Sequence, residues 1–138
     1  MKRYKLLSFN QLGDSRGNLI ALEGMKNIPF EIKRIFYIYE TDQNIIRGQH
    51  ANKKSEFVLI NLAGNCKVKI DDGKNKETIT LNKASEGIYI DKMVWKDMYD
   101  FSKDSILLVL SNQPYDSEEY VKNYIEFKKE IEKIEGEK

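Results

Sequence analysis

The residues best suited to chemistry lie together in one short segment, residues 47–54, which reads RGQHANKK. It contains the only histidine of the chain, His50, whose imidazole can take or give a proton near neutral pH. Arg47 supplies a fixed, planar cation suited to a phosphate or a sugar hydroxyl, and Gly48 frees the backbone between the two. The segment therefore predicts acid–base chemistry on a polar ligand. A single histidine beside a strand is about as often a surface residue or an ordinary hydrogen-bonding group, and the residues alone leave that alternative open.

The counts of histidine and cysteine limit what such a site can hold. One histidine excludes a metal site built from two or three imidazoles of a single chain, so we expect no metal and no other cofactor. One cysteine, Cys66, cannot form an internal disulfide, which argues against a small secreted domain stabilised by such bonds.

Two aromatic segments supply further candidates. Residues 94–100 (VWKDMYD) place Trp95 beside Lys96, and this indole suits either the protein core or the wall of a ligand pocket. The stretch KRIFYIYE has the aromatic and β-branched composition of a half-buried strand. Because side chains alternate along a strand, Arg34 is expected on one face of it and Tyr37 on the other.

These candidates lie among many short strand patterns, and only the end of the chain has a helical period. Strands are predicted over residues 4–9, 18–23, 33–40, 56–62, 66–70, 77–81, 88–90 and 105–111. Apolar residues spaced by three and four over 117–133 predict an amphipathic helix, capped by Asp116 or Ser117. The pattern predicts an all-β sandwich or small barrel and leaves open a jelly roll, a lipocalin-like barrel and an immunoglobulin-like sandwich. No repeat or linker interrupts it, so residues 1–138 are expected to form one domain.

Length and charge narrow the class of protein. A chain of 138 residues is long enough to bury a core, and its formal net charge of +1 argues against a nucleic-acid-binding protein. The N-terminus lacks the pattern of a signal peptide, and no stretch approaches the roughly 18 to 20 apolar residues of a transmembrane helix. We therefore expect a soluble, cytoplasmic protein with neither a nucleic-acid nor a membrane partner.

A series of short motifs follows the order and spacing of a known family. They are residues 14–17 (DSRG), 27–30 (NIPF), 33–39 (KRIFYIY), 47–51 (RGQHA), 62–66 (LAGNC), 71–73 (DDG), 94–102 (VWKDMYDFS), 107–111 (LLVLS), 115–116 (YD) and Tyr120. In these motifs the chain resembles the dTDP-sugar 3,4-ketoisomerases over nearly its whole length. The resemblance implies a cupin jelly-roll fold, a homodimer with exchanged N-terminal strands, and no metal. It also implies conversion of dTDP-4-keto-6-deoxy-D-glucose into a 3-keto-6-deoxy sugar nucleotide, from which 3-amino-3,6-dideoxy sugars are made.

The chain departs from the family pattern at two positions. The family usually reads RGxHAH, where this chain has Asn52 in place of the second histidine, and often Trp-His, where this chain has Trp95 followed by Lys96. His50 is then the only imidazole left for the reaction. Lys96 is expected to replace a hydrogen-bonding or proton-transferring group, and the two changes leave the configuration at C4 of the product open.

The implied reaction gives each candidate a role. His50 is expected to remove the C3 proton of the substrate, and Tyr37 to relay protons between the two oxygens. The arginines are expected to bind the diphosphate or the sugar by charge-assisted hydrogen bonds. The full set of expected substrate-binding residues is Arg16, Arg34, Arg47, Asn52, Trp95 and Lys96.

Two other functions stay open. A sugar-nucleotide 3,5-epimerase shares the cupin fold and the removal of a carbon-bound proton, but usually pairs a histidine with a carboxylate and a tyrosine. A nucleotide-sugar-binding cupin without catalytic activity would explain Asn52 and Lys96 as signs of lost chemistry. The carbons at which deuterium enters the sugar from heavy water distinguish the epimerase from the isomerase. The presence or absence of turnover distinguishes the binding protein from either enzyme.

Overall fold

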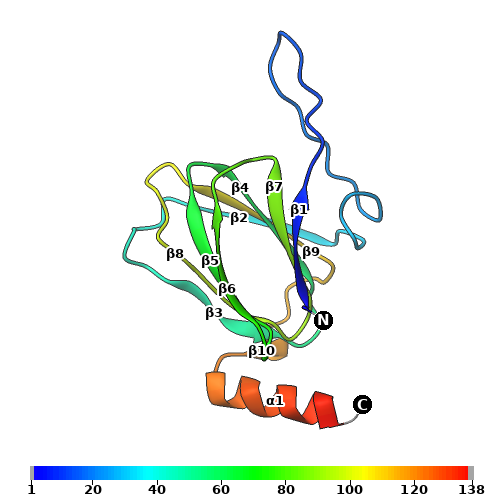
Figure 1. The fold of residues 1–138 in the computed structure, drawn as a ribbon, viewed down its shortest axis with the longest axis vertical. Helices are drawn as coiled ribbons and strands as arrows, with labels where there is room; N and C mark the ends of the chain where they lie inside the picture. The colour runs from blue at the N-terminus through cyan, green and yellow to red at the C-terminus, as the bar shows by residue number, and fades with distance from the viewer. Residues whose placement is uncertain (1, 137–138) are drawn as a thin grey trace.

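The computed structural model describes residues 2–136, which form mainly antiparallel β-structure (Figure 1). The strands are β1 (Tyr4–Ser8), β2 (Arg34–Tyr39), β3 (Arg47–Asn52), β4 (Phe57–Ala63), β5 (Cys66–Asp71), β6 (Lys76–Leu81), β7 (Glu86–Ile90), β8 (Trp95–Tyr99), β9 (Ile106–Ser111) and β10 (Tyr120–Val121). One sheet has the order β1-β7-β4-β9-β2 and the other β10-β3-β8-β5-β6. The sheets enclose a common interior, and the helix α1 (Tyr124–Gly136) lies at the end of the barrel nearest the N-terminus (Figure 1). The predicted all-β fold with a C-terminal helix is confirmed.

Two inner strands of the first sheet, β4 and β9, bury side chains on both faces, which explains their continuous apolar sequences. Leu59 and Leu107 face the interior between the sheets, within the main core cluster. The opposite face belongs to a second cluster, made of Phe9, Ile28, Phe30, Val58, Ile60 and Leu110. The segment between β1 and β2 therefore covers part of the outer face of this sheet.

That segment, residues 9–33, differs from expectation. The strand predicted over 18–23 is wrong, because these residues form no ladder with another strand and their backbone bonds are local, as from the Leu12 amide to the Leu19 carbonyl (2.7 Å). Ile20 and Leu22 pack against the second cluster. Leu12, Leu19 and Met25 stay 56–71% exposed, so the apolar pattern that suggested a strand is only partly buried within one chain.

The C-terminal region also differs from the single helix predicted over residues 117–133. Residues 117–119 form a short 3-10 turn, η1 (Ser117–Glu119), and the next two residues form β10, which pairs with the end of β3. The predicted cap is confirmed for this turn, because the Asp116 side chain accepts a hydrogen bond from the Glu118 amide (3.0 Å). The α-helix starts only at Tyr124, where the Asn123 side chain accepts from the Glu126 amide (3.0 Å). Within residues 2–136, no helix is long and apolar enough to cross a membrane.

Candidate active site

His50 lies in a cavity of about 340 Å³ between the two sheets. Strands from both sheets contribute to it, so it is an interior space of the barrel rather than a surface groove. It is lined by Phe36, Ile38, Arg47, Gly48, His50, Phe57, Leu59, Lys96, Met98, Val109, Tyr120 and Lys122. Apolar side chains form most of its wall, and the imidazole, the three cations and the Tyr120 phenol supply its polar groups.

A β-bulge in β3 aims this strand into the cavity. In a regular strand Arg47 and His50 would face opposite sides, since they are three positions apart. The pairing with β8 shifts between Gly48 and His50, and Gly48 (φ 86°) and Gln49 (φ 55°) take left-handed conformations. A Cβ atom on Gly48 would lie 2.8 Å from the Lys96 carbonyl oxygen, so only glycine permits this close approach. The bulge thus brings the arginine and the histidine to the same cavity.

The hydrogen bonding of His50 defines which nitrogen is available to a substrate. Nδ1 lies 2.8 Å from the carbonyl oxygen of Gly48, which only accepts, so Nδ1 carries the hydrogen in the neutral ring and Nε2 holds the free electron pair. The Tyr120 ring packs on the imidazole at 4.6 Å between centroids. Burial, helped by the nearby Lys96 charge, lowers the pKa of His50 to about 4. The imidazole is therefore neutral at pH 7 and can act as a base.

Lys96 is the second ionisable group of the cavity, and it is 3% exposed. Its Nζ donates to the side-chain oxygen of Asn52 (3.1 Å) and lies 4.4 Å from the centroid of the Phe57 ring. Burial lowers the pKa of this amine to about 7, which brings it into the range of a general acid or base. The two positions at which the chain departs from the pattern of the family that it resembles are thus in direct contact.

Arg34 carries hydrogen-bond donors without partners. It shares the inward face of β2 with Phe36, and its guanidinium carbon lies 5.2 Å from that ring and 5.7 Å from the ring of Tyr115. Its Nε and Nη2 atoms are buried and bond to no other group within residues 2–136. Because unpaired buried donors are costly, these N–H groups indicate an oxygen-rich ligand.

The side chains of three predicted site residues lie outside the cavity. Tyr37 is 62% exposed on the outer face of β2, so the structure does not bring it to His50; alternation places Phe36 in the cavity instead. Trp95 faces away from the cavity because its neighbour Lys96 faces inward, and its ring packs on Tyr124 at 5.3 Å. Arg16 lies in the turn before Gly17 and pairs with Asp14, and its side chain is 88% exposed.

Two polar residues of the cavity, Tyr120 and Lys122, were given no role in the site by the sequence analysis. Tyr120 was expected within a helix, yet it pairs with Asn52 as part of β10 and lies against His50. Lys122 follows it, lines the cavity and lies 5.8 Å from the Tyr120 ring. Two signals could have located them: the place of Tyr120 among the family motifs, and the capped acidic turn at Ser117–Glu119, which ends just before it.

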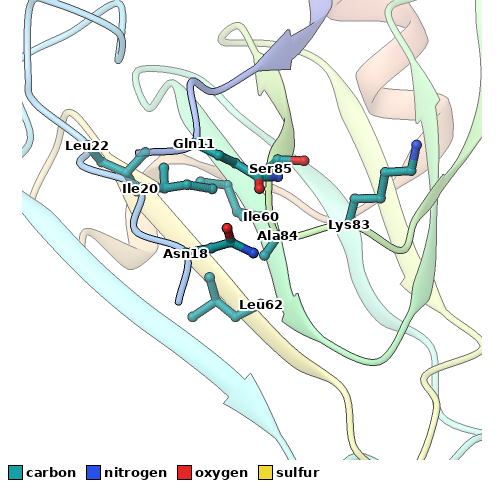
Figure 2. A pocket seen from close by; sticks show the side chains of 9 residues that line it. All are labelled: Gln11, Asn18, Ile20, Leu22, Ile60, Leu62, Lys83, Ala84 and Ser85. Atoms are coloured by element: carbon teal, nitrogen blue, oxygen red, sulfur yellow. The ribbon is translucent and has the colours of Figure 1, made fainter. Parts of the chain in front are cut away.

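A second hollow, of about 440 Å³, lies outside the barrel on the outer face of the first sheet (Figure 2). Ile60 and Leu62 of β4 lie opposite Ile20 of the segment between β1 and β2. Lys83 is the one ionisable side chain among the residues that line it, and it extends away from the apolar ones (Figure 2). This hollow lacks the acid–base groups of the cavity around His50 and suits an apolar contact.

Comparison with known proteins distinguishes between the possible functions of this site. Residues 2–132 match the family model described as FdtA: WxcM-like, C-terminal. The chain belongs to this family. A curated relative, the TDP-4-oxo-6-deoxy-alpha-D-glucose-3,4-oxoisomerase of Aneurinibacillus thermoaerophilus, is 46% identical over 134 residues, which cover 97% of this chain and 96% of the relative.

Solved structures of the FdtA family support the same assignment. WlaRA, a TDP-fucose-3,4-ketoisomerase from Campylobacter jejuni, superposes with a TM-score of 0.88 at 50% identity, covering 93% of this chain and 95% of its own. A histidine-to-asparagine mutant of QdtA, the 3,4-ketoisomerase of Thermoanaerobacterium thermosaccharolyticum, was solved in complex with TDP-4-keto-6-deoxyglucose. It superposes with a TM-score of 0.92 at 38% identity, covering 96% of both chains. The predicted family, its cupin-like jelly roll and the class of enzyme, an isomerase, are confirmed.

Proposed function

We propose that this FdtA-family protein converts dTDP-4-keto-6-deoxy-D-glucose into a dTDP-3-keto-6-deoxyhexose, which supplies 3-amino-3,6-dideoxy sugar biosynthesis. The observation that carries the proposal is the pairing of a neutral His50, with its Nε2 free, and the buried amine of Lys96 in one cavity. A carbonyl migration between neighbouring carbons needs one base for carbon and one donor for oxygen, and these two side chains supply them. The relatives named above act on the same class of sugar nucleotide.

The proposed steps balance without an added oxidant or reductant. Nε2 of His50 removes the proton on C3, the electron pair forms the C3–C4 double bond, and the C4 carbonyl oxygen takes a proton from the Lys96 ammonium. The resulting enediol then loses its C3 hydroxyl proton to Lys96, while the proton held by the imidazole, or one exchanged from solvent, is placed on C4. The Tyr120 hydroxyl replaces Tyr37 as the phenol available to this cavity.

The cations around the cavity fit the remaining parts of the substrate. Arg34 offers its unpaired N–H groups to substrate oxygens, and Arg47 stands at the cavity wall as the partner of the diphosphate. Asn52 acts indirectly, because its side-chain oxygen holds the Lys96 amine in place. Trp95 has no part in this arrangement, since it faces α1.

The reaction is tested by NMR of the product formed from dTDP-4-keto-6-deoxyglucose in heavy water. We expect the carbonyl at C3 of the product, and deuterium at C4 in the fraction of turnovers in which the proton on His50 exchanges with solvent. A carbonyl that stays at C4, with deuterium at C3 and C5, would instead identify a 3,5-epimerase. Binding of dTDP without any exchange of carbon-bound protons would identify a binding protein.

We also propose that two copies form a homodimer by exchanging their N-terminal segments. On the outer face of the first sheet, Ile35, Tyr37 and Tyr39 are 57–62% exposed. The hollow of Figure 2 lies on the same face of this sheet. In one chain the segment between β1 and β2 keeps Leu12 and Leu19 exposed. The sheet face and the segment between β1 and β2 thus both expose apolar side chains. In a dimer, the segment of one chain can cover the sheet face of the other, and both apolar surfaces become buried.

The exchange predicts that Arg16 serves the site of the partner copy. The single variants His50→Asn and Arg16→Ala are both expected to have little activity. Coexpressing the two should restore about a quarter of the native activity, because half of the dimers then hold one complete site out of two. Mixed dimers purified by two different tags should then show about half of the native activity, since each holds one complete site out of two. If no activity returns while the mixed dimers form, Arg16 does not act in the partner's site.

A further inference from the structure

Glu119 is a buried carboxylate next to the active site, and the proposed reaction gives it no role. It is 2% exposed and lies at the end of η1, directly before Tyr120. Its oxygens accept hydrogen bonds from the Ser55 hydroxyl (2.5 Å), the Ser55 amide (2.8 Å) and the Lys54 amide (3.0 Å). Burial raises the pKa of this carboxyl, but these donors outweigh burial and hold it below its ordinary value. Glu119 is therefore a fixed negative charge at neutral pH.

Asn52 connects this carboxylate to the cavity. Its side-chain oxygen accepts from Lys96 Nζ (3.1 Å), and its backbone pairs with Tyr120, the residue after Glu119. The Asn52 amide nitrogen completes no hydrogen bond within residues 2–136, yet its side chain is one of the groups that lower the pKa of the Glu119 carboxyl. The asparagine thus faces the carboxylate on one side and holds the amine on the other.

Glu119 is the anion in the charged surroundings of Lys96. The charged or titratable groups that face this amine or line its cavity are Arg34 from β2, Arg47 and His50 from β3, Glu119 from η1, Tyr120 from β10, and Lys122 after β10. Arg34 disfavours a charge on Lys96, and Glu119 favours it. A positive Lys96 in turn helps to keep His50 unprotonated, as a base must be.

We propose that Glu119 is a positioning residue for the reaction: its buried carboxylate, acting beside Asn52, holds Lys96 as an ammonium ion in the cavity of His50. This inference rests on the proposed function, because it assigns the state of the group that protonates the substrate oxygen. Glu119 itself is not among the residues that line the cavity. Its effect passes through Lys96.

The decisive variant is Glu119→Gln, which keeps the shape of the side chain and removes its charge. Burial already lowers the pKa of Lys96 to about 7, so the alkaline limb of the pH profile of kcat/KM is expected there. Without the carboxylate, Lys96 loses its proton at lower pH, and this limb should move down by about one pH unit. Glu119→Asp keeps the charge but withdraws it by one methylene, and it should shift the limb in the same direction by less. The same limb in all three proteins would overturn the proposal.

Ser55→Ala is the matched control, because it removes a hydrogen bond to the same carboxylate and leaves the charge in place. Its alkaline limb should match that of the native protein, even if its melting temperature falls. A limb that moves as far in this control as in Glu119→Gln would show a structural effect and overturn the proposal.

A readout independent of turnover separates this inference from the proposed function. In protein labelled with ¹³C-lysine, the Lys96 signal is identified by its absence from Lys96→Met, and its titration is followed by NMR. A lower Lys96 pKa in Glu119→Gln supports the role of Glu119 even in a protein that fails to isomerise the sugar. An unchanged Lys96 pKa contradicts that role even if the isomerase activity is established.

Discussion

Replacing His50 with asparagine should lower kcat/KM for the 4-keto sugar nucleotide by roughly a hundred- to ten-thousand-fold. Asparagine is polar and of similar size, but it has no basic nitrogen to take the proton from C3. Nε2 is the free nitrogen of His50, because Nδ1 is bonded to the Gly48 carbonyl. The measurement is the rate at which the C3 proton of the substrate exchanges with heavy water, followed by NMR.

The matched control is Tyr37→Phe. This tyrosine is exposed on the outer face of β2, outside the cavity, so the loss of its hydroxyl should leave the exchange rate close to that of the native protein. If His50→Asn exchanged the C3 proton at the native rate, His50 would not be the base. A large loss in Tyr37→Phe would contradict the placement of that side chain on the outer face of β2, outside the cavity.

Lys96→Met should separate activity from stability. The variant removes the amine that protonates the C4 oxygen, and we expect kcat/KM to fall by about a hundred- to a thousand-fold. The free energy of unfolding should change by only about 1 kcal/mol, because two effects oppose each other. Methionine avoids the cost of burying a cation at a position that is 3% exposed, but it leaves the Asn52 oxygen without its donor.

The measurements are steady-state kinetics and urea unfolding of the same protein samples. Lys69→Met is the control, since Lys69 is exposed on β5 and its loss should change neither quantity substantially. A Lys96→Met protein with native kcat/KM would remove Lys96 from the reaction. A strongly destabilised one would mean that Lys96 is retained for folding.

The local patterns of the chain determined much of the scaffold. Continuous apolar runs predicted β4 and β9, and alternating residues predicted β5 and β6, because burial on two faces or on one leaves a direct mark in the sequence. Strands β3 and β8 were not predicted, since both are rich in polar residues. Those polar residues are the ones that line or support the cavity.

The alternation rule also located some site residues and excluded others. It placed Arg34 and Tyr37 on opposite faces of β2, as observed, but could not say which face was interior. It failed at β3, where the bulge at Gly48 brings Arg47 and His50 to one side. A bulge depends on the pairing with a distant strand, so the sequence of β3 alone does not reveal it.

By itself, the sequence determined which side chains are available for the reaction and to which family the protein belongs. One histidine limits the imidazole base to His50, and the order of the motifs identified the family. Only the tertiary structure decided what surrounds that histidine. It joined Lys96 to Asn52 across 44 positions of the chain, set Glu119 beside them and turned Trp95 and Tyr37 away. The physical reason is that contact, burial and charge depend on distances between strands, and strands distant in sequence become neighbours only when the sheets close around the cavity.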